Sequence, residues 1–323
     1  MTKRAERAGT GVADGRVGRR GRVLAGTAVF AGLLLLFHGM VPNRVGRLGS
    51  LLESFLPWLG VPVVVLLVPA LVRRSPLALV ALLLPAAAWT YLFGGLLLPA
   101  PGPGDDDLVV VQHNVSDENP DPEGTARALV RAEPDLIALE ELVSPALEVY
   151  AETLAPDYPY RTVRGTVGLW SKHPLDGTGP LDIAPQGIGE GWERGLRAVA
   201  HTPRGEIAVH VAHLPSVRVR ASGLASSWRD ESAGLLGDAL DAEEQSRVVL
   251  LGDLNGTVDD RALAPLTSRL DVAERGLALS FPAGFPVARI DQVLARGATV
   301  ESVRTLSATG SDHLPVAARV TWD

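Results

Sequence analysis

The amino-acid sequence predicts an α/β domain in which two sheets pack face to face with helices on their outer sides, preceded by three membrane-spanning helices. Residues 1–98 contain three long uncharged apolar runs, whereas residues 108–323 contain short apolar runs separated by helical and turn segments. The charge divides in the same way. Residues 1–98 carry eleven basic and three acidic side chains, net +8, which leaves 19 basic and 34 acidic side chains, net −15, for the remainder.

The first 98 residues are expected to form a basic tail and a membrane anchor. Residues 1–22 are Arg-rich without a hydrophobic period and are expected to be a disordered cytoplasmic tail. The anchor, 23–98, contains uncharged runs at 23–41, 55–72 and 76–98, of 19, 18 and 23 residues. At a rise of about 1.5 Å per residue, each run can cross a hydrocarbon core of about 30 Å. A cleaved signal peptide is the competing interpretation of the first run, but no small-residue cleavage site follows it and two more runs do.

The positions of the arginines predict the orientation of this anchor. The N-terminal arginines belong on the same side of the membrane as Arg73 and Arg74, and Arg44 and Arg47 belong on the other side. The balance places the N-terminus in the cytoplasm, so that everything beyond the anchor is extracellular. The linker 99–107 is rich in Pro, Gly and Asp and cannot form a core. The chain has no Cys, which leaves the redox compartment open.

The remaining residues, 108–323, are enough for one domain with a sizeable core. Short apolar runs predict strands at 108–112, 136–139, 167–170, 196–200, 207–211, 248–251, 292–295 and 316–321. Helices are predicted at 125–132, 145–154 and 223–240. Strands of this kind with helices between them favour two facing sheets with flanking helices.

Polar side chains follow the most apolar of these strands. After 248–251 come Gly252, Asp253 and Asn255, which present a carboxylate and a carboxamide in one turn. Such a turn also occurs without any chemistry. A second polar group near the C-terminus favours a functional site over a simple turn. It contains Asp291, Asp312 and His313.

Other predicted strands also end in polar residues, namely Asn114, Glu140, Glu141 and His213. The combined set contains carboxylates, carboxamides and histidines, and it lacks a thiol and the glycine-flanked serine of a nucleophile elbow. Carboxylate oxygens suit a hard divalent cation such as Mg²⁺. With such a cation, water is the expected nucleophile and a phosphate the expected group attacked.

These residues lie in segments that resemble the signature segments of the endonuclease/exonuclease/phosphatase superfamily. The segments occur in the family's order over nearly all of 108–323, at Asn114, 139–141, 168–175, 211–214, 252–255, 289–291 and 311–313. The resemblance implies a four-layer αββα sandwich, the DNase I-like fold, and hydrolysis of phosphate esters with Mg²⁺ or Mn²⁺. The preceding spans further resemble the VanJ-type membrane proteins of glycopeptide resistance, which are thought to act on undecaprenyl pyrophosphate, the lipid carrier of cell-wall synthesis.

The resemblance also implies a role for each residue. Glu141 and Asn114 would hold the metal, with Asp312 beside it. Asp253 would orient or deprotonate the attacking water, and Asn255 would hydrogen-bond a phosphate oxygen. Asp291 would fix the tautomer of His313, which would bind or protonate the phosphate. His213 would supply a further phosphate contact. Neutral amide and imidazole donors are suited to the charge that develops on phosphoryl oxygens.

The chain departs from the family pattern at two positions. Glu140 stands where a Gln is common, so a second carboxylate is expected next to the ligand Glu141. Ala212 stands where a Thr is common. Two further residues, Arg218 and Arg220, follow His213 and have the chemistry to grip a pyrophosphate, although an exposed loop pair is an equal interpretation.

The charge of the domain argues against a nucleic-acid substrate. A nuclease needs basic side chains along the phosphate backbone, and a domain of net charge −15 lacks such a groove. A few arginines beside a metal are enough for a pyrophosphate head group. The sequence therefore predicts a membrane-bound phosphohydrolase for a polyprenyl pyrophosphate, with the lipid substrate and the membrane as its partners.

Two alternatives remain open from the sequence. One is a phosphodiesterase that acts on phospholipid head groups or on extracellular nucleic acid. The other is a domain without activity that binds cell-wall lipid and shields it from an antibiotic. The complete polar set from Asn114 to His313 argues against the second alternative.

Overall fold

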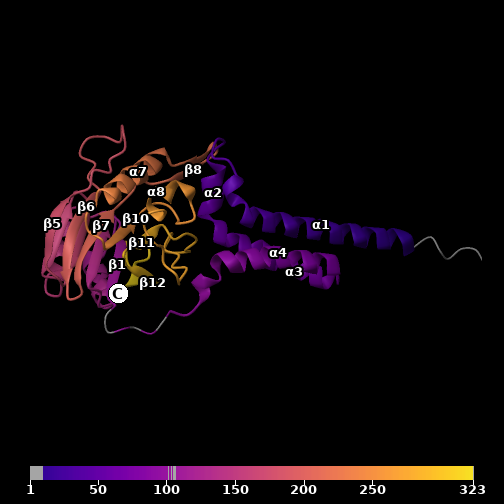
Figure 1. Ribbon diagram of the computed structural model, residues 1–323, viewed down its shortest axis with the longest axis horizontal. Helices are drawn as coiled ribbons and strands as arrows, with labels where there is room; N and C mark the ends of the chain where they lie inside the picture. The colour runs from indigo at the N-terminus through magenta and orange to yellow at the C-terminus, as the bar shows by residue number, and fades with distance from the viewer. Residues whose placement is uncertain (1–9, 101, 103, 105–106, 323) are drawn as a thin grey trace, which may run out of the picture. The chain divides into compact units, whose positions relative to one another are not determined.

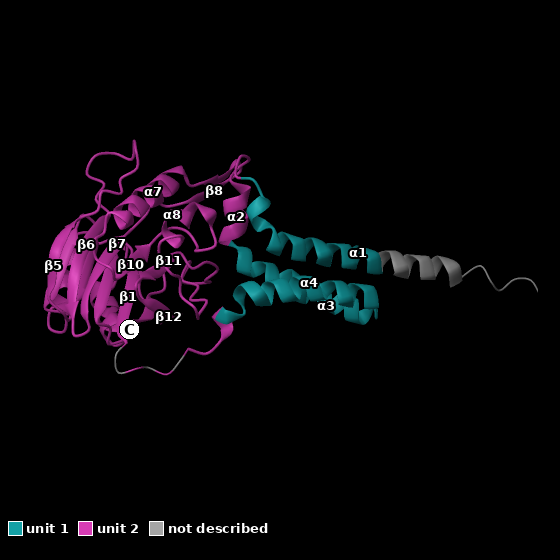
Figure 2. Cartoon of the chain, viewed as in Figure 1, with its two compact units in different colours: residues 1–42, 55–95 teal, residues 43–54, 96–323 magenta. Residues whose placement is uncertain are grey.

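The computed structural model describes residues 10–100, 102, 104 and 107–322, with side chains from residue 21 onward. It contains two compact units. Residues 1–42 and 55–95 group together as the helical unit, and residues 43–54 and 96–323 group as the sandwich unit (Figure 2). Residues 1–9 of the expected tail and 101, 103 and 105–106 of the expected linker lie outside the described residues.

The helical unit is built from apolar helices. Their bounds are α1 Thr10–Leu36, η1 His38–Met40, η2 Leu56–Leu59, α3 Gly60–Val72 and α4 Pro76–Phe93. A short turn, η3 Gly95–Leu97, follows. Small residues pack where the helices meet, at Ala28, Ala70 and Ala78, while large apolar side chains such as Val64 and Leu83 are about two-thirds exposed. An exposed apolar surface of this kind is characteristic of helices that face a partner or a lipid.

The helix lengths do not by themselves establish the three predicted membrane spans. Among the described residues, only α4 is by itself long and apolar enough to cross a membrane. The predicted run 55–72 begins with the turn η2, which contains Pro57, and α3 starts only at Gly60. That run reaches span length only when paired with α2, across a bend of 76°. The apolar part of α1 is shorter, and α1 begins at Thr10, inside the stretch expected to be unstructured.

The sandwich unit contains two large sheets (Figure 1). Among its described residues, one large sheet has six strands and the other has five, and a separate two-stranded sheet lies within residues 218–225. The first sheet has the order β12-β13-β1-β2-β4-β3, with bounds Thr299–Thr305, Val316–Thr321, Leu108–Asn114, Leu136–Glu140, Val167–Ser171 and Tyr160–Arg164. The second has the order β11-β10-β7-β6-β5, with bounds Asp291–Arg296, Val248–Asp253, Gly205–Ala212, Gly195–Thr202 and Leu175–Pro180. Both sheets are mixed, because β1 is parallel to β2 and β10 is parallel to β7 while other pairs are antiparallel.

Three apolar clusters divide this unit into four layers. The cluster between the sheets joins residues of both, such as Val110 and Leu136 of the first sheet to Val209 and Leu251 of the second. A second cluster lies under α7, Ser227–Asp241, and a third lies under α5, Pro122–Val130, and α6, Ala146–Leu154. Successive side chains of a strand point to opposite faces of its sheet. One face of each sheet therefore packs in the cluster between the sheets, and the other packs under the helices. The expected αββα sandwich is confirmed.

All eight predicted strands are present, but several others were missed. The outermost strands β3 and β5 are largely exposed and carry polar residues or Gly, so they have no apolar run that would indicate a strand. The sequence also predicts a helix over 223–240. The structure instead forms a hairpin from β8, Arg218–Arg220, and β9, Gly223–Ala225, and the helix begins at Ser227. Gly223 has φ of 114°, which a helix does not allow.

Candidate active site

Asp253 is the last residue of β10, and its position depends on two residues near it. Gly252 has φ of 151°, and a Cβ there would lie 1.9 Å from the Ala212 carbonyl oxygen, so only glycine lets β10 approach β7 this closely. Asn255 has a left-handed φ of 47°, and its N–H donates to Asp253 Oδ1 at 2.9 Å. One side-chain N–H of Asn255 donates to the Leu214 carbonyl at 2.9 Å. An amide nitrogen has two N–H donors, so the second can serve a substrate oxygen.

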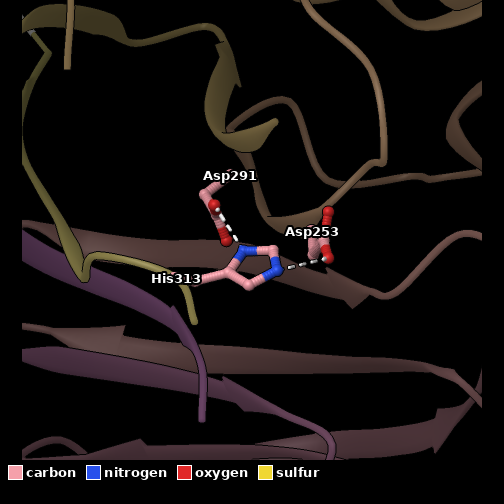
Figure 3. A group of neighbouring side chains, drawn as sticks. All are labelled: Asp253, Asp291 and His313. Atoms are coloured by element: carbon pink, nitrogen blue, oxygen red, sulfur yellow. Dashed lines mark hydrogen bonds and ion pairs between the residues drawn. The ribbon is translucent and has the colours of Figure 1, made fainter. Parts of the chain in front are cut away.

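His313 lies between two aspartates (Figure 3). Its Nδ1 is 2.9 Å from Asp291 Oδ2, and its Nε2 is 3.8 Å from Asp253 Oδ2. The two aspartates are paired residues of β10 and β11, so the sheet register itself sets their spacing. The His313 backbone N–H donates to Ser311 Oγ, which in turn donates to the Asn114 carbonyl at 2.7 Å. The loop that carries His313 is thereby joined to the end of β1.

The charges of this group depend on one another. Burial disfavours the imidazolium, but Asp291 and Asp253 raise the pKa of His313 to about 10. Burial raises the pKa of Asp253 to about 7, although the positive charge of His313 opposes that rise. Burial also opposes ionisation of Asp291, but the charge and hydrogen bond of His313 bring the Asp291 pKa below its usual value. The arrangement therefore provides an imidazolium donor next to a carboxylate that can take up a proton.

A second group of side chains adjoins Asp253. Asn114 Nδ2 donates to Glu141 Oε1 and to Asp253 Oδ2, each at 3.1 Å. His213 Nε2 is 3.8 Å from Glu141 Oε1 and 3.7 Å from Asp253 Oδ2. Glu141 has a φ of 60°, a left-handed conformation that costs roughly 1–2 kcal/mol for a residue with a Cβ. It directs a partly exposed carboxylate to this group.

These side chains fit a hard divalent cation. Glu141 supplies an accessible carboxylate beside the amide of Asn114, and Asp253 supplies a second carboxylate. Asp253, Asp291 and His313 also have ligand atoms within 4.8 Å of one another and could hold a metal. His313 is less suited to that role because its pKa of about 10 keeps both ring nitrogens protonated at neutral pH. Oxygen ligands are the ones that Mg²⁺ prefers.

Asp312 stands apart from the other predicted metal ligands. It precedes His313, is exposed, and its backbone carbonyl accepts the Ala283 N–H. None of the described contacts joins its carboxylate to Asn114 or Glu141, and its role as a ligand stays a prediction.

Glu140 is buried, unlike the adjacent Glu141, whose carboxylate is partly exposed. It points into the space between the sheets, as Leu136 and Ala138 do, and is fully buried. Its Oε2 accepts from Gln112 Nε2 at 2.8 Å, and the same nitrogen is 3.0 Å from Asp291 Oδ1. Burial raises the pKa of Glu140 well above its usual value. The extra carboxylate thus shares the Gln112 amide with Asp291 and is buried, whereas the Glu141 carboxylate is partly exposed.

Sequence reasoning missed Arg194, which adjoins the site. Its Nη1 lies 3.3 Å from His213 Nδ1, and its backbone carbonyl accepts the His213 N–H at 2.9 Å. Burial and the nearby Arg194 charge lower the pKa of His213 to about 3, so this imidazole is neutral. Arg194 follows a Gly-rich loop without any motif that would identify it. Arg218 and Arg220 are exposed on β8, and no described contact brings them to the site.

Comparisons with known proteins agree with this fold. A family model described as "Endonuclease/Exonuclease/phosphatase family" matches residues 111–313. No curated protein matches the chain with significant similarity. Solved structures with a similar fold each cover about two thirds of this chain. The mannosyl-6-phosphatase of Bacteroides thetaiotaomicron is 18% identical, with TM-score 0.54, 67% of this chain covered and 100% of that one.

Two further similar structures come from other bacteria. Sphingomyelinase C of Streptomyces griseocarneus is 20% identical, with TM-score 0.50, 66% of this chain covered and 99% of that one. A variant of the beta toxin of Staphylococcus aureus, with bound magnesium ions, is 14% identical, with TM-score 0.52, 67% of this chain covered and 100% of that one. At these identities the likeness establishes a shared fold.

Proposed function

Because the chain belongs to the endonuclease/exonuclease/phosphatase family, we propose that it is a metal-dependent phosphohydrolase of the cell membrane that dephosphorylates undecaprenyl pyrophosphate. The observation that carries the proposal is His313, held between Asp291 and Asp253, with Asp253 joined through the Asn114 amide to the carboxylate of Glu141. These side chains supply an acid, a base and a metal ligand in one place. In its cellular role the enzyme would recycle the carrier of cell-wall synthesis, as in VanJ-type glycopeptide resistance.

The residues divide the work of water attack on the terminal phosphorus. Glu141 and Asn114 would hold Mg²⁺ or Mn²⁺, and a bound cation polarises phosphoryl oxygens. Asp253 orients the water and takes its proton as the new P–O bond forms. The bridging P–O bond breaks and leaves undecaprenyl phosphate and inorganic phosphate. The imidazolium of His313 and the amide of Asn255 donate to the phosphoryl oxygens.

Two features of the chain favour a lipid pyrophosphate over nucleic acid. Residues 99–323 have a net charge of −15, which repels a polyanion. The helical unit carries exposed large apolar side chains such as Val64 and Leu83, and a membrane anchor would confine the site to the surface where a lipid substrate concentrates. Arg194, beside His213, offers a guanidinium to the second phosphate of a pyrophosphate.

The anchor is part of the same proposal. Three spans, at about 23–41, 55–72 and 76–98, would place the N-terminus in the cytoplasm and the sandwich unit outside the cell. The support is the length of the uncharged runs and the distribution of the arginines. Two C-terminal reporters test this topology, one active only outside the cytoplasm and one active only inside it. A signal from the cytoplasmic reporter alone would overturn it.

A second candidate is a phosphodiesterase that acts on phospholipid head groups. It is favoured by the similar fold of sphingomyelinase C, whose name implies cleavage of a lipid phosphodiester. Both candidates use the same site and differ in the bond that is broken.

Parallel assays of the full chain in detergent separate the candidates. The substrates are undecaprenyl pyrophosphate, sphingomyelin, phosphatidylcholine and plasmid DNA, each with Mg²⁺ or with a chelator. The proposal predicts metal-dependent phosphate release from the pyrophosphate and little turnover of the others. Release of phosphocholine, or nicking of the plasmid, without release from the pyrophosphate would replace the proposed substrate.

A further inference from the structure

The segment Asn43–Ser54, which lies between the first two apolar runs of the sequence, groups with the sandwich unit (Figure 2). It contains α2, Leu48–Ser54, which Figure 1 shows beside β8. The Gly46 carbonyl accepts the Leu224 N–H at 2.9 Å. Gly46 and Gly223 both have positive φ, and a Cβ on Gly223 would lie 2.0 Å from the Gly46 oxygen. This backbone contact therefore requires glycine at position 223.

Two ion pairs join the same segment to the sandwich unit. Arg47 pairs with Asp230 of α7. Glu53 is buried and accepts from Arg261, with contacts of 2.7 and 2.8 Å to the guanidinium and 3.1 Å to the backbone N–H. A buried carboxylate with three donors has a fixed place, because separating it from them would leave an unpaired charge.

Both ion pairs adjoin a buried group around Arg229 that holds Asn255: Asp230 belongs to that group, and Arg261 follows its member Asp260. Arg229 is 1% exposed and donates to Asp230 Oδ1 at 2.9 Å, to Asp260 Oδ2 at 2.6 Å and to the Asn255 carbonyl at 3.0 Å. A Cβ on Gly256 would lie 2.1 Å from Arg229 Nη1. The backbone after Asn255 is therefore closely fitted to this guanidinium.

We propose that Asn43–Ser54 is a positioning element of the active site, which fixes Asn255 through Arg229. Arg47 holds Asp230, and Glu53 holds Arg261 next to Asp260. Asp230 and Asp260 are the two carboxylates that orient the Arg229 guanidinium against the Asn255 carbonyl. The guanidinium is thus a third contact on Asn255, besides those to Asp253 and Leu214, and its displacement would let the turn and the direction of the amide shift. The effect on turnover rests on the proposed function, in which this amide contacts a phosphoryl oxygen.

The first test compares turnover of undecaprenyl pyrophosphate by the full chain and its variants in detergent. Arg47→Ala and Glu53→Gln are each expected to lower kcat by about 5- to 50-fold with KM changed less than twofold, because the misplaced donor acts in the transition state. Arg47→Lys keeps the charge and is expected to recover most of kcat. The matched control is Arg269→Ala. It removes an ion pair to Asp241, which lies on α7 as Asp230 does, and this ion pair does not contact the Arg229 group.

A double-mutant comparison tests the route. If Arg47 acts through Asp230, Arg47→Ala lowers kcat in the parent but has no further effect in an Asp230→Asn background. If the double variant instead shows the sum of the losses of Arg47→Ala and Asp230→Asn in activation free energy, the proposed connection is overturned. Unchanged kcat in both Arg47→Ala and Glu53→Gln would also overturn it.

Hydrogen exchange separates this inference from the proposed function. Amides of residues 254–260 are expected to exchange at least tenfold faster in Arg47→Ala and Glu53→Gln than in the parent or in Arg269→Ala. If the parent releases no phosphate from the pyrophosphate, the proposed function fails, and the exchange result still decides whether Asn43–Ser54 holds Asn255. Exchange that matches the parent in both variants would overturn the inference.

Discussion

His313 Nδ1 lies 2.9 Å from Asp291 Oδ2, and the Nε2 on the other side of the ring faces Asp253 Oδ2 at 3.8 Å. One imidazole thus connects the paired end residues of β10 and β11. Since Asp291 is fully buried and also accepts from Gln112 at 3.0 Å, its place is fixed from two directions. Asp291 therefore determines both the orientation and the charge of His313.

Asp291→Asn is expected to lower kcat by about 100- to 10,000-fold, because the amide neither stabilises the imidazolium nor selects its orientation. Phosphate release measures this loss. Asp241→Asn, on the exposed end of α7, is the matched control and is expected to stay within twofold of the parent. A loss of less than threefold in Asp291→Asn would mean that His313 does not act as a charged donor.

Glu141→Gln is expected to raise the Mg²⁺ concentration needed for half-maximal activity by at least about tenfold, because it removes the accessible carboxylate of the metal group. A metal titration of activity checks this result. Glu140→Gln is the neighbouring comparison and is expected to shift the Mg²⁺ requirement less, since the Glu140 carboxylate is fully buried and contacts Gln112. A larger shift in the Mg²⁺ requirement for Glu140→Gln than for Glu141→Gln would assign the metal to the buried carboxylate.

Arg194→Ala is expected to lower kcat/KM for the pyrophosphate by about 10- to 100-fold, and Arg194→Lys by less, because a guanidinium binds two phosphate oxygens and an ammonium acts as a point charge. The loss for a monophosphate should be smaller, since it has no second phosphate. Arg218→Ala serves as the control on the exposed strand β8. Equal losses for the pyrophosphate and the monophosphate would contradict a role for Arg194 in binding the second phosphate.

The His210 side chain, away from this site, is expected to make the fold sensitive to acid. His210 is buried against Glu243 at 2.9 Å, and burial lowers its pKa below the usual value of 6.5. The unfolded chain therefore binds a proton below pH 6.5 that the folded chain resists, and stability is lost as the pH falls. The loss begins near pH 6.5 and grows as the pH falls further toward the lowered pKa of the folded state.

His210→Gln removes the titrating imidazole. The variant is therefore expected to lose less thermal stability than the parent between pH 7 and pH 5. Thermal unfolding of parent and variant in the same detergent measures the difference. Parallel curves over this pH range would show that folding does not lower the pKa of His210.

The site was predictable where a polar residue ends an apolar strand. Asp253, Asn114 and His213 all follow runs that the sequence shows clearly, and the structure brings them together with Glu141, Asp291 and His313. Arg194 was not predictable, because its contact with His213 arises from the pairing of β6 with β7. Edge strands such as β3 have no buried face to produce an apolar pattern. The ion pair of Glu53 was not predictable either, because its partner Arg261 lies 208 residues away in the sequence.

The central claim is that the group around Asp253 and His313 hydrolyses a lipid pyrophosphate with the help of a metal. Its most direct test is release of inorganic phosphate from undecaprenyl pyrophosphate in detergent, by the parent and by Asp253→Ala, with Mg²⁺ and with a chelator. The account predicts release by the parent that requires the metal and falls at least 1,000-fold in the variant, on the order seen when a catalytic group is removed. Release that persists in Asp253→Ala, or in the chelator, would contradict it.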